Sequence, residues 1–208
     1  GVNANFRAAA LPGGRAADKG PGEDSYPRLD HTAELTAATV VHLHGAAVLP
    51  RYDGYPTNWF LAGQSDEYFY GNIDLNNDGQ TLWYHDHALG LTRLNVYMGI
   101  AGAYVLEESG PVFNLPTGSN DIALIIQDRL LNANGTLRYH TNFEDNFFGD
   151  KMVVNGKIWP RHNVLKGKYR FRLVNGCNSR TLTISFTPTD LDWWVIASDH
   201  GLLTAPVQ

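Results

Sequence analysis

The sequence has little of several features that would place a protein in a common class. Cys177 is the only cysteine among 208 residues, so the chain cannot form an internal disulfide and its redox compartment stays open. No apolar run approaches the roughly eighteen residues of a membrane-spanning helix, so we expect no membrane partner. The formal net charge is −5 and the basic residues form no stripe, which argues against nucleic acid as a partner.

Helical periodicity is also nearly absent, and short strand-like runs take its place. Apolar and aromatic runs are separated by turns that contain Gly, Pro, Asn and Asp, a pattern typical of β-sandwiches. Hydrophobic residues make up 43% of the chain and aromatic residues 12%, enough for a substantial core. We therefore predict an all-β fold with one short helix or turn at 87–96. The expected strands cover residues 34–49, 66–73, 81–85, 98–106, 122–127, 151–155, 168–174, 180–186 and 193–197.

A change in composition divides these strands into two groups. Residues 108–120 contain Pro111, Pro116 and two glycines, which is the composition of a domain linker. We predict a first domain at 1–107 and a second at 121–208.

Two His-x-His pairs lie in strand-like runs, at residues 40–45 (VVHLHG) and 82–87 (LWYHDH). Residues i and i+2 of a strand share a face about 6.6 Å apart, so each pair presents two imidazoles on one surface. Imidazole suits zinc, copper, iron and nickel. Two histidines at this spacing diverge, which favours adjacent ions over chelation of one. The sequence thus predicts a metal cluster. The four candidate ligands are His42, His44, His85 and His87.

A single His-x-His pair on a strand is more often an ordinary surface or core feature than a ligand pair. The presence of two such pairs, one of them followed at once by Gly45, favours the metal site. Asp86 lies between two of the histidines and points to the opposite face of its strand, so we do not expect its side chain to support them.

Both runs resemble the first two copper motifs of the multicopper oxidases. Several further segments resemble the spore-coat laccase, bilirubin oxidase and phenoxazinone synthase branch of that family, in the same order along the chain. The resemblance extends from about Leu29 to the last residue. The supporting segments are residues 52–56 (YDGYP), 91–97 (LTRLNVY), 153–160 (VVNGKIWP) and 168–175 (KYRFRLVN).

The resemblance implies cupredoxin-like Greek-key β-sandwiches, the first domain lacking its opening strands and the second incomplete. It implies copper as cofactor, with His42 on the type 2 ion and His44, His85 and His87 on the type 3 pair. Asp53 matches the family's acidic residue near the type 2 copper, where a carboxylate can relay protons to oxygen. The alternative for Asp53 is an ordinary turn residue before Gly54.

The function implied is that of a laccase-like oxidoreductase, in which one-electron oxidation of a phenol-like substrate is coupled to four-electron reduction of O2 to water. The chain carries half of the trinuclear ligands and no type 1 site. Its expected partners are therefore O2, a small reducing substrate and the remaining part of the oxidase with copper motifs 3 and 4. We expect the 208 residues alone to be inactive. The alternatives are a non-catalytic copper-binding β-sandwich and a structural coat component.

The other candidates have weaker support. Cys177 has no histidine nearby in the sequence, so we expect a small buried or half-buried thiol and no blue-copper site. The remaining histidines match no ligand of the family and are expected to be structural or surface residues; they are His31, His140, His162 and His200. An extracytoplasmic or spore-associated location is favoured by the resemblance alone.

Overall fold

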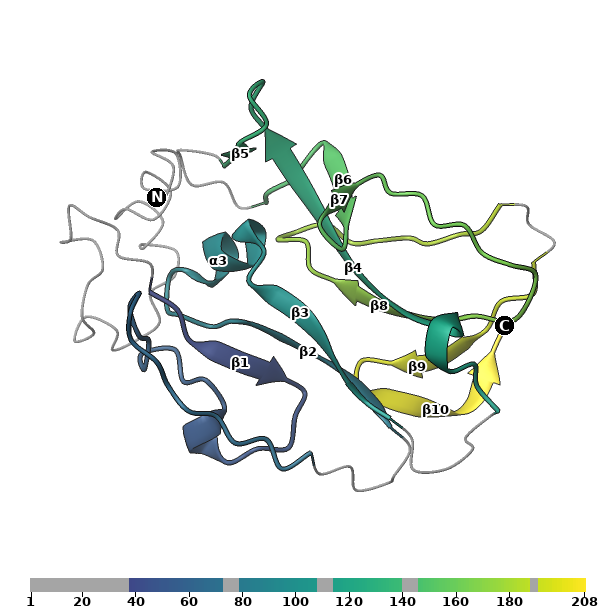
Figure 1. Cartoon of the computed structure of the whole chain (residues 1–208), viewed down its shortest axis with the longest axis horizontal. Helices are drawn as coiled ribbons and strands as arrows, with labels where there is room; N and C mark the ends of the chain where they lie inside the picture. The colour runs from purple at the N-terminus through teal and green to yellow at the C-terminus, as the bar shows by residue number, and fades with distance from the viewer. Residues whose placement is uncertain (1–37, 73–78, 108–113, 140–145, 188–190) are drawn as a thin grey trace.

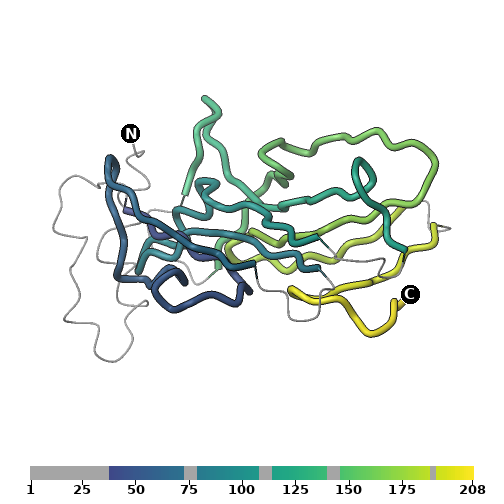
Figure 2. Tube along the Cα trace, turned by 60° about the horizontal axis from the view of Figure 1, so that its bottom comes forward, coloured from purple at the N-terminus to yellow at the C-terminus, as the bar shows by residue number. Residues whose placement is uncertain are grey.

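Strands dominate the structure, a computed structural model that describes residues 38–72, 79–107, 114–139, 146–187 and 191–208. They form a three-stranded sheet, a five-stranded sheet and a two-stranded hairpin. In the view of Figure 1 the strands β4–β8 lie above the first sheet, and the β9–β10 hairpin lies to its right; Figure 2 shows the same molecule turned by 60°. The expectation of a mainly β fold is confirmed within these residues.

The first sheet is an antiparallel meander of β1 (Val41–His44), β2 (Gln80–Asp86) and β3 (Ala101–Leu106), with β2 in the centre. Both histidine pairs belong to its β1–β2 edge. A 3-10 turn, η3 (Pro50–Tyr52), leads into the loop that carries Asp53. The two predicted motif strands are therefore neighbours in space.

The second sheet is built on β4, an eleven-residue strand with partners on both sides. It pairs antiparallel with β5 and β6 and parallel with β8, while β7 extends from β6. The turn η4 (Gly118–Asn120) precedes β4, and the β9–β10 hairpin follows β8 along the chain. The bounds are β4 Asp121–Leu131, β5 Leu137–Arg138, β6 Lys151–Val154, β7 Lys157–Ile158, β8 Arg170–Asn175, β9 Val195–Ser198 and β10 Gly201–Val207.

One short helix, α3 (Thr92–Met98), packs between the two sheets. Gly99 ends it in the left-handed conformation with φ +109°, a backbone position that glycine adopts without steric cost. Four consecutive helical residues, 94–97, are buried, which marks α3 as a core element and not a surface helix. Among the described residues, no helix is long and apolar enough to cross a membrane.

A hydrophobic core made of described residues joins the two halves. It combines residues from the first sheet and α3 with residues from the second half, all at most 9% exposed. The proposed division into domains at 1–107 and 121–208 stays a prediction, but the two parts share this core. Its members are Ala38, Val40, Ala88, Leu91, Leu94, Tyr97, Leu130, Tyr139 and Phe147.

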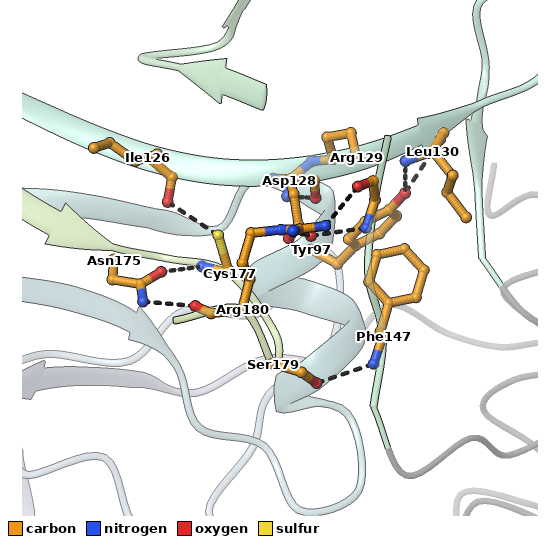
Figure 3. Close-up of polar contacts among 11 residues, drawn as sticks. Tyr97, Ile126, Asp128, Arg129, Leu130, Phe147, Asn175, Cys177, Ser179 and Arg180 are labelled. Atoms are coloured by element: carbon orange, nitrogen blue, oxygen red, sulfur yellow. Dashed lines mark hydrogen bonds and ion pairs between the residues drawn. The ribbon is translucent and has the colours of Figure 1, made fainter. Parts of the chain in front are cut away.

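Tyr97 is the polar centre of this core. Its hydroxyl accepts a hydrogen bond from the Leu130 N–H (2.8 Å) and lies 3.1 Å from the Leu130 carbonyl (Figure 3). It also lies 2.7 Å from the carbonyl of Arg138. Gln127 on β4 adds a hydrogen bond to the carbonyl of Val96, 3.1 Å away. The end of α3 is therefore fixed to β4 by polar contacts inside an apolar core.

A buried ion pair adds a second connection. Arg172 on β8 makes two hydrogen bonds to the Asp121 carboxylate, at 2.6 and 2.8 Å, and donates a third to the hydroxyl of Thr81 on β2, 2.7 Å away. Arg172 is 5% exposed, so its guanidinium has lost most of its contact with water, and the hydrogen bonds to the Asp121 carboxylate offset the cost of burying the charge.

Two expected strands are wrong, and three observed strands, β5, β7 and β10, were not predicted. Residues 66–72 and 180–186 run without regular pairing, although their apolar and polar residues alternate. Alternation of apolar and polar residues indicates that one face of a segment is buried, but it does not show that another strand is available to pair with that segment. The strand β10 contains Pro206 and few strongly β-prone residues, and it forms because β9 pairs with it.

The variant Tyr97→Phe tests the connection between α3 and β4. Removing the hydroxyl leaves the buried N–H of Leu130 without its partner, so we expect the free energy of unfolding to fall by about 1–3 kcal/mol. Urea unfolding followed by circular dichroism measures this loss. Tyr104→Phe is the matched control, because its hydroxyl bonds Asn72 at an exposed site. Equal losses in both variants would contradict the role of Tyr97.

Candidate metal centre

The register of β1 against β2 brings the histidine pairs together. His42 lies directly opposite His85, and His44 lies opposite Trp83. The antiparallel pairing therefore places the rings of His42, His44 and His85 on one face of the sheet. Their centroids are 5.2 Å apart for His42–His85 and 5.4 Å apart for the other two pairs.

These separations fit imidazoles that share a metal ion. With metal–nitrogen bonds of about 2.0–2.1 Å and angles of about 90–120°, ring centroids lie about 4.5–5.5 Å apart. One nitrogen from each of His42, His44 and His85 lies within 4.8 Å of the others. The His44 Nδ1 and His85 Nε2 atoms are only 3.2 Å apart, about the edge length of such a coordination shell. The donor set therefore fits an imidazole-binding metal.

Two backbone carbonyls orient the rings. Nδ1 of His85 donates to the carbonyl of Asp86 at 2.8 Å, and Nδ1 of His42 donates to the carbonyl of Asp53 at 2.5 Å. Each bond fixes a tautomer and leaves Nε2 as the free lone pair, as metal-binding histidines require. The carboxylate of Asp86 points away from the site as expected, but its carbonyl supplies a contact that was not predicted.

The Asp86 carboxylate holds the two strands in place from the opposite face. It is fully buried and accepts hydrogen bonds from Thr39 Oγ1 (2.7 Å), the Val40 N–H (3.2 Å) and the Ala88 N–H (3.0 Å). The N–H of His87 also donates to the Val40 carbonyl at 2.9 Å. The chain just after β2 is thus tied to the chain just before β1.

His87 is positioned by the turn that follows β2, which the hydrogen bonds to Asp86 and Val40 hold in place. Its ring centroid is 4.8 Å from that of His42 and 5.8 Å from that of His85. It is not part of the three-nitrogen group, but its Nδ1 is buried without a hydrogen-bond partner of good geometry. A buried ring nitrogen in this state is suited to a ligand role.

Asp53 lies beside His42, as the motif spacing suggested. Its carboxylate Oδ1 is 3.4 Å from His42 Nδ1, and its side chain is 54% exposed. Gly54 has φ +77°, and a Cβ at this position would lie 2.1 Å from the Val41 carbonyl oxygen. Only glycine allows the loop to pack this closely on β1, which fixes the Asp53 carbonyl on His42.

Partial burial disfavours the charged form of three of the histidines. Desolvation is the main cause that lowers the pKa values of His44, His85 and His87, and the neighbouring imidazoles lower them further. Neutral imidazole is the form that binds metal, so protons compete weakly for these rings near neutral pH.

Two residues at the cluster were not predicted to be there. The Trp83 ring packs 4.3 Å from His85 and 5.4 Å from His44. His200, expected to be a structural or surface residue, lies with its ring 5.4 Å from that of His44. His162 is exposed as expected, and His31 and His140 fall outside the described residues.

Cys177 belongs to a different part of the fold. It lies close to Asp128 and Arg180, which form an ion pair at 2.9 Å (Figure 3). The N–H of Gly149 donates to the Asp128 carboxylate, and the Gly149 carbonyl accepts from Arg180. Burial raises the pKa of the Cys177 thiol to about 11, so the thiolate that a copper site needs is disfavoured. The expectation of a half-buried thiol is confirmed.

Comparison with known proteins gives a consistent assignment. Residues 24–110 match the family model of a multicopper oxidase. The chain is 38% identical to a laccase of Bacillus subtilis (strain 168) over 206 residues, covering 86% of this chain and 40% of that protein. It is 40% identical to multicopper oxidase LPR1 of Arabidopsis thaliana over 187 residues, covering 82% and 32%. A crystal structure of the 2F4 variant of the multicopper oxidase McoA from Aquifex aeolicus aligns with TM-score 0.72 and 32% identity, covering 81% of this chain and 38% of that one.

The strand-rich fold and the imidazole cluster are those of a cupredoxin-like copper protein. The chain belongs to the multicopper oxidase family, and its relatives include laccases. Both the family and the fold class expected from the sequence are confirmed. The chain spans 32–40% of the length of the three proteins compared here.

The variant Asp86→Asn tests the support of the cluster. The asparagine amide has one acceptor oxygen, and its NH2 group would face the N–H and O–H groups that now donate to the carboxylate. At least one of these buried donors therefore loses its partner. We expect the free energy of unfolding to fall by about 3 kcal/mol. Chemical denaturation measures it, and Asp66→Asn, at an exposed position, serves as control. An unchanged unfolding midpoint would show that the carboxylate does not hold the strands together.

Proposed function

We propose that this chain forms part of a laccase-like oxidase that couples oxidation of a phenol-like reducing substrate to reduction of O2 to water. In this proposal the chain contributes half of the imidazole ligands of a trinuclear copper site. The resemblance assigns His42 to the type 2 ion and His44, His85 and His87 to the type 3 pair.

The observation that carries the proposal is the convergence of the rings of His42, His44 and His85 from two neighbouring strands, with the ring of His87 beside them from the turn after β2. Copper, when bound there, would supply the one-electron chemistry and the binding of O2. The protein residues hold the rings: the carbonyls of Asp53 and Asp86 fix two of the tautomers, and the buried Asp86 carboxylate fixes the strand ends. Preorganisation of this kind keeps the ligands in place without a metal.

Asp53 is proposed to move protons at its carboxylate. Reduction of O2 to water consumes protons, which must reach the site from solvent. The Asp53 side chain is exposed on one side and lies 3.4 Å from the His42 ring on the other, so it joins bulk water to the cluster. An ordinary turn aspartate would explain the loop but not this placement.

The cluster is open on the side of His44, which is exposed to solvent. The other imidazoles of a trinuclear site would approach from this side, carried by a further part of the oxidase with copper motifs 3 and 4. On this proposal the 208 residues bind copper but do not turn over substrate alone. The extracytoplasmic or spore-associated location remains a proposal that rests on resemblance.

Copper titration of the 208-residue chain tests the site. We expect bound copper that survives desalting, and a dissociation constant at least tenfold higher in the double variant His42→Asn/His85→Asn, because this variant loses two central ligands. His162→Asn, at an exposed site, is the control and should bind as the unmodified chain does. Equal binding by all three chains would contradict the proposed function.

A further inference from the structure

The turn between β9 and β10 brings a fifth histidine to the cluster. Ser198 pairs with Gly201, so Asp199 and His200 form a two-residue turn at the tip of this hairpin. Asp199 has φ +50°, a conformation that aspartate tolerates better than most residues. In Figures 1 and 2 the tip of the hairpin faces the end of β1.

Gly45 makes room for the ring of His200. A Cβ at position 45 would lie 2.2 Å from His200 Cδ2 and 2.3 Å from its Nε2, closer than any real contact. The ring therefore occupies the space that a side chain would fill directly after His44. The glycine that ends the first histidine motif thus has a packing role in addition to its φ of +86°.

His44 lies between two imidazoles at equal ring distance. Its ring centroid is 5.4 Å from that of His85 and 5.4 Å from that of His200, and both values lie within the range for rings that share an ion. The planes of His44 and His200 are inclined by 41°, similar to the 44° between His44 and His85.

We propose that His200 is a metal-binding residue of this chain, which binds a copper(II) ion together with His44. His200 provides an imidazole beside His44, in addition to the imidazoles that β1 and the end of β2 supply. This inference rests on the proposed function, since it needs copper at His44. It adds a ligand from the second half of the chain to a site otherwise built by β1 and β2.

Copper(II) binding by His200→Ala tests the inference. Loss of one imidazole ligand should weaken the tightest copper site about tenfold or more. It should also reduce the number of imidazole nitrogens coupled to the ion in pulsed electron paramagnetic resonance. His162→Ala is the matched control, because it removes an exposed histidine of the second half of the chain. A dissociation constant within twofold of the unmodified chain, with the same nitrogen coupling, would overturn the inference.

Modification of the unaltered chain with diethylpyrocarbonate gives a readout that does not depend on folding of a variant. Copper should protect His200 from modification while His162 reacts at the same rate with and without the metal. Equal modification of His200 in both states would also overturn the inference. If the unmodified chain binds no copper, the proposed function fails as well. If it binds copper and only the His200 results are negative, the proposed function stands without this ligand.

Discussion

The buried carboxylate of Asp86 is the constraint on which the metal centre depends. On one side of β2 it accepts three hydrogen bonds that tie the chain before β1 to the turn after β2. The backbone carbonyl of the same residue, Asp86, accepts a hydrogen bond from the His85 ring and orients it. A side chain that never touches the cluster therefore fixes the register that places His42 opposite His85 and the turn that carries His87. Burial without water makes each of these bonds costly to lose.

The hydrophobic core and its polar contacts connect the histidine cluster to the second half of the chain. The helix α3 begins five residues after His87, and its last buried residue, Tyr97, bonds β4 in the second half of the chain. Arg172 adds a link from β8 to β2. The two halves are thus one packed unit around α3, which explains how the β9–β10 hairpin can bring His200 to a site formed by the first sheet.

The sequence predicted the local features and missed those that depend on distant pairing. The His-x-His pairs, their shared face and their strands follow from the two-residue period, and the glycine after Asp53 indicated its turn. No local pattern could show that the carbonyl of Asp86 would orient His85, or that His200 would meet Gly45 across more than 150 residues. The strands expected at 66–73 and 180–186 failed for the same reason: alternation cannot reveal whether a partner strand is available.

The most direct measurement is an anomalous difference map, recorded at the copper edge, from crystals of the chain grown with copper. The account predicts a peak within about 2.0–2.2 Å of imidazole nitrogens on the shared face of His42, His44 and His85. It also predicts that the Asp86 side chain stays on the opposite face, bonded to Thr39 and Ala88. Copper bound elsewhere with these rings unligated, or β1 and β2 paired in another register, would contradict it.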